Sequence, residues 1–408
     1  SVLAKVKALV SKVRNAVSGK EETGIYKGFK YEETGVEGAE FEVYAKDTIY
    51  SPDGAKDEAG NPVVRYEKDD LVAKLTTDEN GTAVINNLPL GTYYLKEVVA
   101  GENFVLNTEQ KEFTLTAEDD TQAVVYEGVT YKNERQKVSV SVEKKDSVTG
   151  EKLEGVIFGL YAAEDILSNQ GEVLVEKDTL LEKKATDAKG TLTFDSDLPH
   201  GKYYVKEVGT AYGYVLDEEP RYVDLSYRDQ DTPVVVYDED WQNNRQKVKV
   251  NVLKKEKDTD RVLKGGIFGL YTRNDILSAS GKVLMEADTL IELKTTDADG
   301  KISFIADLPI DGTYYVKELY APDGFVTTGE EQEFVFEYQG DKEAEASYEF
   351  VFEDEPTTVE LSKTDLTTGE ELPGARLQLT DENGAVVEEW TSTKEPHIIK
   401  ELVVGKSY

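Results

Sequence analysis

The sequence predicts an all-β protein made of tandem immunoglobulin-like β-sandwich modules. Residues 138–144 (VSVSVEK) and 248–254 (VKVNVLK) alternate apolar and polar side chains, which is the two-residue period of half-buried strands. Turn sequences of the form DENG, DAKG or DADG separate the strand-like runs, and they begin at Asp78, Asp187, Asp297 and Asp381. Short strands, frequent turns and little helical periodicity are typical of a β-sandwich.

An internal repeat divides the chain into modules. The string YYLKE at 93–97 returns as YYVKE at 203–207 and 314–318, so its closing glutamates are 110 and 111 residues apart. A period of this size corresponds to one β-sandwich. The repeat resumes at 357 and stops halfway, so we expect three complete modules and the first half of a fourth, in a chain cut from something longer. The expected boundaries are 21–135, 136–245, 246–356 and 357–408.

The joins between modules are short. NERQKV at 133–138 and NNRQKV at 243–248 lead directly from the last strand of one module into the first strand of the next. Joins of this length favour a semi-rigid string of modules over freely tumbling domains.

Residues 1–20 differ from the rest of the chain. They carry five cations and no anions, and an apolar stripe with helical spacing is formed by Val2, Val6, Leu9, Val13 and Val17. We expect a short basic helix here. One interpretation is that this helix binds a membrane surface or a partner protein. The other, which is favoured, is that it packs on the first module or belongs to an upstream domain.

Composition excludes several classes of function. The 47 Lys and Arg residues against 82 Asp and Glu give a net charge of −35, which repels phosphate backbones and anionic lipids, so no nucleic-acid partner is expected. The chain has no Cys and only two His, so it offers no thiol nucleophile, no disulfide and little for metal or imidazole chemistry. No 18-residue apolar run is present, so we expect no membrane span in this fragment. Since no metal cluster or phosphate-binding loop is visible either, we also expect no cofactor.

The strand alternation places three polar side chains of each module on the inward, apolar face. A lysine ends the valine series of the first strand, as in Val140, Val142 and Lys144. The same parity turns inward the glutamate that closes each YYVKE-type string and the Asn or Asp near the end of the last strand. The positions are Lys144, Lys254 and Lys363; Glu97, Glu207 and Glu318; and Asn133, Asn243 and Asp354.

Burial gives these residues an unusual chemistry. A buried lysine loses its proton more easily and a buried glutamic acid holds its proton more tightly. A neutral amine can attack the side-chain carbonyl carbon of Asn or Asp, while the glutamic acid transfers protons. The product is an amide between lysine Nζ and the Asn or Asp side chain, with loss of ammonia or water. The competing interpretation is a buried ion pair, or side chains that reach the sheet edge. Recurrence of all three positions favours the cross-link.

The combined motif resembles the collagen-adhesin B-type modules, also called SpaA-type prealbumin-like domains, of Gram-positive surface adhesins and pilins. The front of the motif is clearest at Lys363-Thr364-Asp365 with Gly369 and LPGA at 372–375, and its middle at LPHGKYYVKE, residues 198–207. The resemblance covers about residues 21–408 and implies intramolecular isopeptide bonds.

Carried over by position, the resemblance implies one triad in module 2 and one in module 3, while module 1 departs from the pattern and its lysine has to be chosen. The two triads are Lys144, Glu207 and Asn243 in module 2, and Lys254, Glu318 and Asp354 in module 3, where Asp replaces the usual Asn. In module 1 we choose Lys27 with Glu97 and Asn133, because Lys27 precedes Gly38 by the same interval as Lys144 precedes Gly155. Lys30 is the alternative. The fourth module keeps Lys363 but has no partner strand in this chain.

The sequence therefore favours a structural function. We expect a stalk or shaft segment of a secreted, cell-wall-anchored adhesin or pilus-like protein, whose partners are neighbouring modules of a longer chain. The alternative is an adhesin whose inter-strand insertions, at 45–70, 162–182 and 272–292, contact a host glycoprotein or matrix protein. A turnover enzyme is not expected, because no nucleophile–His pair, metal cluster or phosphate loop is present; the cross-link would form once.

Overall fold

The computed structural model describes residues 14–17, 28–117, 127–168, 170–278 and 281–408. Every regular element among these residues is a β-strand, which confirms the all-β prediction. The chain forms two compact units, one comprising residues up to 211 together with 216–243, and the other 212–215 together with 244–408. Each unit is described by itself.

The expected N-terminal helix is contradicted where residues 1–20 are described. Strand β1 (Arg14–Val17) pairs antiparallel with β2 (Phe29–Glu32), so the prediction of a helix is wrong for these four residues. The rest of the segment lies outside the described residues. A short isolated helix is marginal in water, whereas β2 offers main-chain groups for pairing.

Module 1 contains a four-stranded antiparallel sheet in the order β6-β3-β7-β8. Its strands are β3 (Glu40–Ala45), β6 (Leu71–Thr76), β7 (Gly91–Val99) and β8 (Lys111–Leu115). The insertion after β3 forms a small hairpin of β4 (Ile49–Tyr50) and β5 (Val64–Tyr66). Alternate residues of β7 are buried, so Tyr93, Leu95 and Glu97 face the core as the parity predicts.

Module 2 contains two sheets and a hairpin. The first sheet, in the order β14-β9-β17, consists of β9 (Lys137–Asp146), β14 (Thr191–Thr193) and β17 (Val234–Asn243). The second, in the order β13-β10-β15-β16, consists of β10 (Ile157–Ala162), β13 (Leu180–Ala185), β15 (Lys202–Gly209) and β16 (Arg221–Asp224). The hairpin is β11 (Ile166–Leu167) with β12 (Val173–Val175).

Module 3 repeats this arrangement. One sheet, in the order β23-β18-β27-β25, consists of β18 (Lys247–Glu256), β23 (Lys301–Phe304), β25 (Phe325–Val326) and β27 (Glu345–Pro356). The other, in the order β22-β19-β24-β26, consists of β19 (Ile267–Thr272), β22 (Leu290–Thr295), β24 (Thr313–Tyr320) and β26 (Glu331–Val335). The hairpin is β20 (Ile276–Leu277) with β21 (Val283–Met285).

The chain from 357 onward forms two two-stranded ribbons. They are β28 (Thr358–Leu361) with β31 (His397–Lys400), and β29 (Arg376–Thr380) with β30 (Val386–Thr391).

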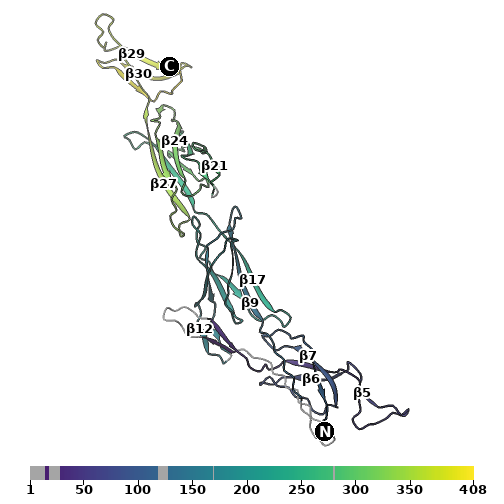
Figure 1. The fold of residues 1–408 in the computed structure, drawn as a ribbon. Coiled ribbons are helices and arrows are strands. Elements are labelled where there is room, and N and C mark those ends of the chain that lie inside the picture. Colours follow the sequence, from purple (N-terminus) through teal and green to yellow (C-terminus); the bar gives the residue numbers. More distant parts are fainter. Residues whose placement is uncertain (1–13, 18–27, 118–126, 169, 279–280) are drawn as a thin grey trace. The chain divides into compact units, whose positions relative to one another are not determined.

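The first and last strands of modules 2 and 3 are parallel neighbours. Strand β17 runs beside β9, and β27 runs beside β18, each pair in register over ten residues (Figure 1). Between the two sheets of module 2 lies an edge-to-face aromatic pair, Phe158 and Trp241, with ring centroids 5.1 Å apart; Phe268 and Phe352 form the same pair in module 3, also at 5.1 Å. These rings form the core wall against which the polar residues are buried.

Candidate functional site

The strand register of module 2 brings its predicted lysine and asparagine together. Lys144 on β9 lies opposite Trp241 on the parallel strand β17, so Asn243, two residues further on, projects from the same face of the sheet beside the lysine. Glu207 comes from β15 in the other sheet, where it lies opposite Phe158 of β10. Three polar side chains from three strands and both sheets therefore meet inside the core.

The contacts among these three groups are short. Lys144 Nζ donates to Asn243 Oδ1 at 2.6 Å and lies 2.8 Å from Glu207 Oε2. Asn243 Nδ2 donates to Glu207 Oε1 at 2.6 Å. The side chains of Lys144 and Glu207 are both 0% exposed, so this pair has no access to solvent. One carboxyl group thus contacts both the lysine nitrogen and the amide nitrogen of Asn243.

Burial favours the neutral forms of the lysine and the glutamic acid. Desolvation lowers the pKa of Lys144 below its ordinary value, although the carboxyl group of Glu207 opposes this. Desolvation also raises the pKa of Glu207, with Lys144 opposing. The rings of Trp241 and Phe158 lie 5.5 and 5.7 Å from Lys144 Nζ and complete the apolar wall. A neutral amine beside a neutral carboxylic acid is the protonation state in which lysine acts as a nucleophile.

Local turns fix the end of the strand that carries the lysine. Lys144 N donates to Gly190 O at 2.7 Å, and a Cβ on Gly190, whose φ is +71°, would lie 2.6 Å from Lys144 O, so this turn requires glycine. Asp146, the acid of the Lys-x-Asp motif, accepts from the main-chain N of Val148 and of Thr149, both at 2.8 Å. The motif therefore joins the reactive position to the turn that ends its strand.

Module 3 assembles the same site with an acid in place of the amide. Lys254 Nζ lies 2.9 Å from Glu318 Oε2 and 2.5 Å from Asp354 Oδ1. Lys254 lies opposite Phe352 in the parallel pair, so Asp354 is again two residues beyond the paired aromatic residue. All three residues are buried, and desolvation raises the pKa of Glu318 to about 7.

Module 1 brings together two of its three predicted residues. Asn133 Nδ2 donates to Glu97 Oε2 at 2.7 Å and to Val105 O at 3.0 Å, and Glu97 Oε2 also accepts from Asn107 N at 2.7 Å. Desolvation raises the pKa of Glu97 to about 6. Lys27 lies outside the described residues. Lys30, the alternative, is exposed on β2.

The fourth lysine is not in a core. Lys363 is exposed, and only its main chain is held, with Leu372 N donating to Lys363 O at 2.6 Å. Its region still has the expected turn, because Asp365 accepts from Thr367 N at 2.8 Å and from Thr368 N at 3.0 Å, as Asp146 does in module 2.

Sequence reasoning missed two supporting groups. Thr210 Oγ1 accepts from Asn243 Nδ2 at 2.7 Å in module 2, and Asn107 N donates to Glu97 in module 1. The position of Thr210 is Ala100 in module 1 and Ala321 in module 3, so the repeat gave no signal for it. A main-chain donor such as Asn107 N depends on the course of the loop and has no residue signature.

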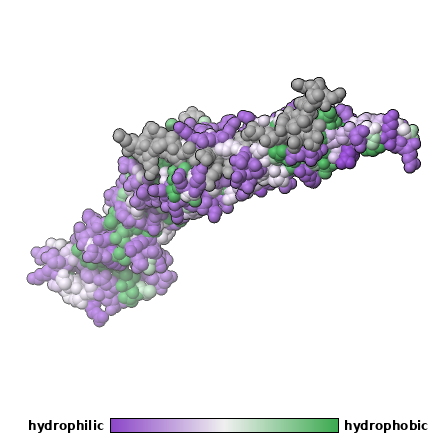
Figure 2. All heavy atoms as spheres, turned by 90° about the horizontal axis from the view of Figure 1, so that it is seen from below, coloured by the Kyte–Doolittle hydropathy of each residue, from purple (hydrophilic) through white to green (hydrophobic). Residues whose placement is uncertain are grey.

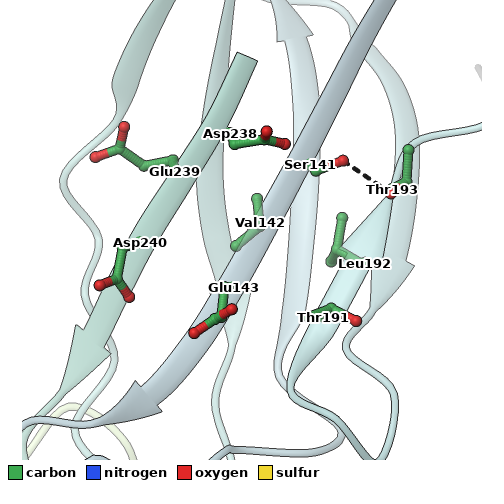
Figure 3. Close-up of a pocket in the computed structure, with 9 residues that line it drawn as sticks. All are labelled: Ser141, Val142, Glu143, Thr191, Leu192, Thr193, Asp238, Glu239 and Asp240. Carbon is green, nitrogen blue, oxygen red and sulfur yellow. Dashed lines mark hydrogen bonds between the residues drawn. The ribbon is translucent and has the colours of Figure 1, made fainter. Parts of the chain in front are cut away.

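In module 2, the outer face of the sheet that carries Lys144 and Asn243 forms a shallow groove of about 550 Å³ (Figure 3). Strands β9, β14 and β17 line it, and Ser141 and Thr193 are hydrogen-bonded across it at 2.8 Å. Two of its carboxylates have basic partners: Asp240 pairs with Lys145 at 2.7 Å, and Glu143 pairs with Lys152. In the part of the chain that is described, no group of three Asp, Glu or His side chains could hold a metal ion, and no helix could span a membrane.

The arrangement supports one type of chemistry. The amine of Lys144 touches the carboxamide of Asn243, and Glu207 touches the nitrogen that would attack and the nitrogen that would leave. Glutamic acid in this position can accept a proton from the first nitrogen and donate one to the second.

Known proteins share this fold. The family model described as SpaA prealbumin-like fold domain matches residues 23–130, 138–240, 248–349 and 357–408. Comparison with curated protein sequences gave no match.

Three solved structures illustrate the similarity. The Bacillus anthracis TIE protein is 21% identical, with a TM-score of 0.50. The match covers 87% of this chain and 50% of that one, so this chain spans half the length of that protein. The Streptococcal ancillary pilin is 21% identical (79% of this chain, 93% of that one, TM-score 0.24). BcpA, the major pilin subunit of Bacillus cereus, is 14% identical (87% and 99%, TM-score 0.31). The four family matches cover most of the sequence, and the chain belongs to the family of SpaA-type prealbumin-like fold domains.

Proposed function

We propose that this chain is a stalk or shaft segment of a cell-surface adhesin or pilus-like protein, and that its modules cross-link themselves through Lys–Asn and Lys–Asp isopeptide bonds. The observation that carries the proposal is the buried triad of Lys144, Glu207 and Asn243, with its counterpart in module 3. Fully buried lysines are rare in cores, and two at equivalent positions with the same partners point to a shared chemical purpose.

The proposed reaction in module 2 balances within the triad. Lys144 Nζ, as the neutral amine, attacks Asn243 Cγ, and Glu207, as the neutral acid, protonates Asn243 Nδ2, which its Oε1 contacts at 2.6 Å, so that the Cγ–Nδ2 bond breaks. The carboxylate left on Glu207 takes up the proton that Nζ loses, across the 2.8 Å contact with its Oε2. An amide forms, one ammonia leaves, and Glu207 ends with as many protons as it had. The site reacts once and does not turn over.

In module 3 the same steps release water. Lys254 Nζ attacks Asp354 Cγ, and Glu318, protonated up to a pH of about 7, donates the proton that lets the hydroxyl group depart. Loss of one water joins the amine and the acid as an amide. Module 1 would follow the module 2 scheme, with Lys27 as the expected amine and Asn133 as its target.

The bond would change how a module carries force. It joins the first strand to the last strand of the module, which are already neighbours in one sheet. Tension that enters along one of these strands and leaves along the other would pass through a covalent bridge instead of through hydrogen bonds. A protein without disulfides would gain mechanical and proteolytic resistance from such bridges.

The match to the SpaA-type family over most of the chain supports placing it on a Gram-positive cell surface, as the resemblance of its motifs implies. We propose that it is secreted and anchored to the cell wall by parts outside these residues, and that its partners are neighbouring modules of a longer chain. The repeat of one fold along the chain supports the stalk assignment.

Peptide mapping tests this proposal. Proteolysis of the purified chain followed by tandem mass spectrometry should yield branched peptides joining Lys144 to Asn243 and Lys254 to Asp354. The Glu207→Ala variant should lose the first branched peptide and keep the second. Only linear peptides containing these lysines would refute the cross-linking proposal.

One observation favours a second function, in which the insertions bind a host protein. Their hairpins expose apolar side chains in all three modules, and the surface seen in Figure 2 is mostly hydrophilic. The largest exposed examples are Tyr50, Leu167, Val173, Leu277 and Leu284. In module 1 an open pocket of about 700 Å³ lies beside β5 and is lined in part by Arg65, Tyr66 and Pro89.

Surface-plasmon resonance against immobilised matrix glycoproteins tests this second function. Binding should fall when Tyr50, Leu167 and Leu277 are all replaced by Ser, while triple replacement of exposed lysines outside the hairpins should leave it unchanged. Equal binding by both variants would rule out the hairpins as the contact surface.

A further inference from the structure

We infer that Gln230, a residue of module 2, positions the cross-linking residues of module 1, so that the module 1 site is completed by the module that follows it. This inference rests on the proposed self-cross-linking function. Gln230 lies in the segment between β16 and β17, and it reaches module 1 within the same compact unit.

Gln230 makes three hydrogen bonds to the main chain of module 1. Its Oε1 accepts from Ala100 N at 3.0 Å and its Nε2 donates to Val98 O at 3.0 Å. Its main-chain O accepts from Leu106 N at 2.8 Å. The amide side chain and its own peptide group therefore tie together two segments of module 1 that are not joined to each other by a sheet.

These two segments hold the reactive groups. Val98 directly follows Glu97, whose carboxyl group is the proposed proton carrier. Leu106 lies between Val105, whose O accepts from Asn133 Nδ2 at 3.0 Å, and Asn107, whose N donates to Glu97 Oε2 at 2.7 Å. Gln230 thus fixes the spacing between the segment that carries Glu97 and the loop that orients both Glu97 and Asn133.

A second residue of module 2 supports the same loop. Tyr227 donates its hydroxyl group to Phe104 O at 3.3 Å. In the second compact unit, Tyr338 donates to Tyr214 O at 2.7 Å in the same way. The tyrosine contact is therefore repeated, whereas the glutamine contact belongs to module 1.

Module 2 has a substitute for the glutamine within its own sequence. Thr210, three residues after Glu207, accepts from Asn243 Nδ2, but the corresponding residue after Glu97 is Ala100, which has no hydroxyl group. The residue of module 3 that corresponds to Gln230 is Asp341. The two modules align here because Lys137 N donates to Pro233 O, three residues after Gln230, just as Lys247 N donates to Ala344 O, three residues after Asp341. An aspartate has no N–H donor to reproduce the contact with Val98 O.

The test compares cross-linking rates in the full-length chain. In Gln230→Met, which keeps the length of the side chain and removes its polar atoms, we expect the module 1 bond to form roughly tenfold or more slowly, because small misplacements of reacting groups are costly. Modules 2 and 3 of the same molecules should react at the wild-type rate. Thr210→Ala is the matched control and should slow module 2 alone. Time courses of cell-free-synthesised protein, followed by peptide mapping, measure all three bonds together.

Two further measurements separate positioning from stability. In Gln230→Met, hydrogen exchange should speed up at the amide of Ala100, because that amide loses its side-chain acceptor. The amide of Leu106, whose acceptor is the main-chain O of residue 230, and the amides of β3 and β7 should stay protected. Adding Ala100→Thr, which supplies the hydroxyl group that module 2 uses, should restore part of the module 1 rate; a purely structural loss would not be rescued this way. If the amides of β3 and β7 also exchange faster in Gln230→Met, the rate of the module 1 bond is measured in Gln230→Ala instead.

The outcomes distinguish the two proposals. Absence of a module 1 bond in the wild-type chain would overturn the cross-linking proposal for that module, and the inference with it. A wild-type bond that forms equally fast in Gln230→Met would overturn the inference alone.

Discussion

Replacing Lys144 by Met and Glu207 by Leu together should lower the free energy of unfolding of module 2 by about 5–6 kcal/mol. The double change is chosen because removing either group alone would leave its partner buried and unpaired, which carries its own large penalty. Replacing a whole buried pair with apolar side chains of similar size is nearly neutral, so the loss reports the missing covalent bond.

The magnitude follows from the loop that the bond closes. Lys144 and Asn243 are 99 residues apart, and closing a loop of that length removes about 4.7 kcal/mol of chain entropy from the unfolded state at 25 °C. The double variant also keeps the carboxamide of Asn243 buried, without the amine and the carboxyl group that surround it in the unreacted site, which adds about 1 kcal/mol. The Nδ2 of this carboxamide can still donate to Thr210 Oγ1.

Differential scanning calorimetry of the full chain provides the assay. One transition should fall by roughly 20–50 °C, since 1 kcal/mol corresponds to about 4–8 °C for a domain of this size. The transitions of the other modules should stay in place. Lys202→Met, which changes an exposed lysine on β15, is the control and should move nothing. A shift of only a few degrees in the double variant would refute the covalent tie.

Of three further predictions, two concern the chemistry of module 3 and one concerns the contacts of Arg135. Asp354→Asn should keep the module 3 bond and release ammonia in place of water, so the cross-linked variant should have the same intact mass as the cross-linked wild type. An intact mass higher by one ammonia would show that the bond is lost and that the acid is required. The module 3 bond should form more slowly as the pH rises above about 7, because Glu318 then loses the proton needed by the leaving hydroxyl group. Before the bond forms, the raised pKa of Glu318 stabilises the folded module at low pH, and this contribution is lost as the pH rises from about 4.5 to about 7. A rate of bond formation that increases above pH 7 would contradict the assigned role. Arg135→Ala removes a guanidinium that lies 4.1 Å from the ring centroid of Tyr31 and donates to Leu198 O at 2.9 Å; hydrogen exchange around Leu198 should become about tenfold faster, and unchanged exchange would show that the contact is dispensable.

The main features of the fold could be predicted because they follow from the two-residue period. Burial alternates along β9 and β18 so that the valines and then Lys144 and Lys254 face the core, which confirms the predicted parity. The sequence could not show that the first and last strands are parallel neighbours. That pairing follows from main-chain hydrogen bonds between residues about 100 positions apart, which leave no local pattern.

Two features of the sequence were misleading or silent. The apolar stripe in residues 1–20 has helical spacing, yet Arg14–Val17 pairs with β2, because a neighbouring strand satisfies main-chain groups that a short helix alone cannot hold stably. Gln230 carried no signal at all, because its importance lies in which main-chain groups of module 1 it reaches. Such contacts depend on the packing of one module against another and not on the residue pattern within a module.

Intact mass of the purified full-length chain tests the central claim most directly. The account predicts a mass below that of the sequence by two molecules of ammonia and one of water, for bonds at Asn133, Asn243 and Asp354. A mass equal to that of the sequence would show that the buried lysines, glutamic acids and their partners remain unbonded, and it would contradict self-cross-linking as the basis of a stalk.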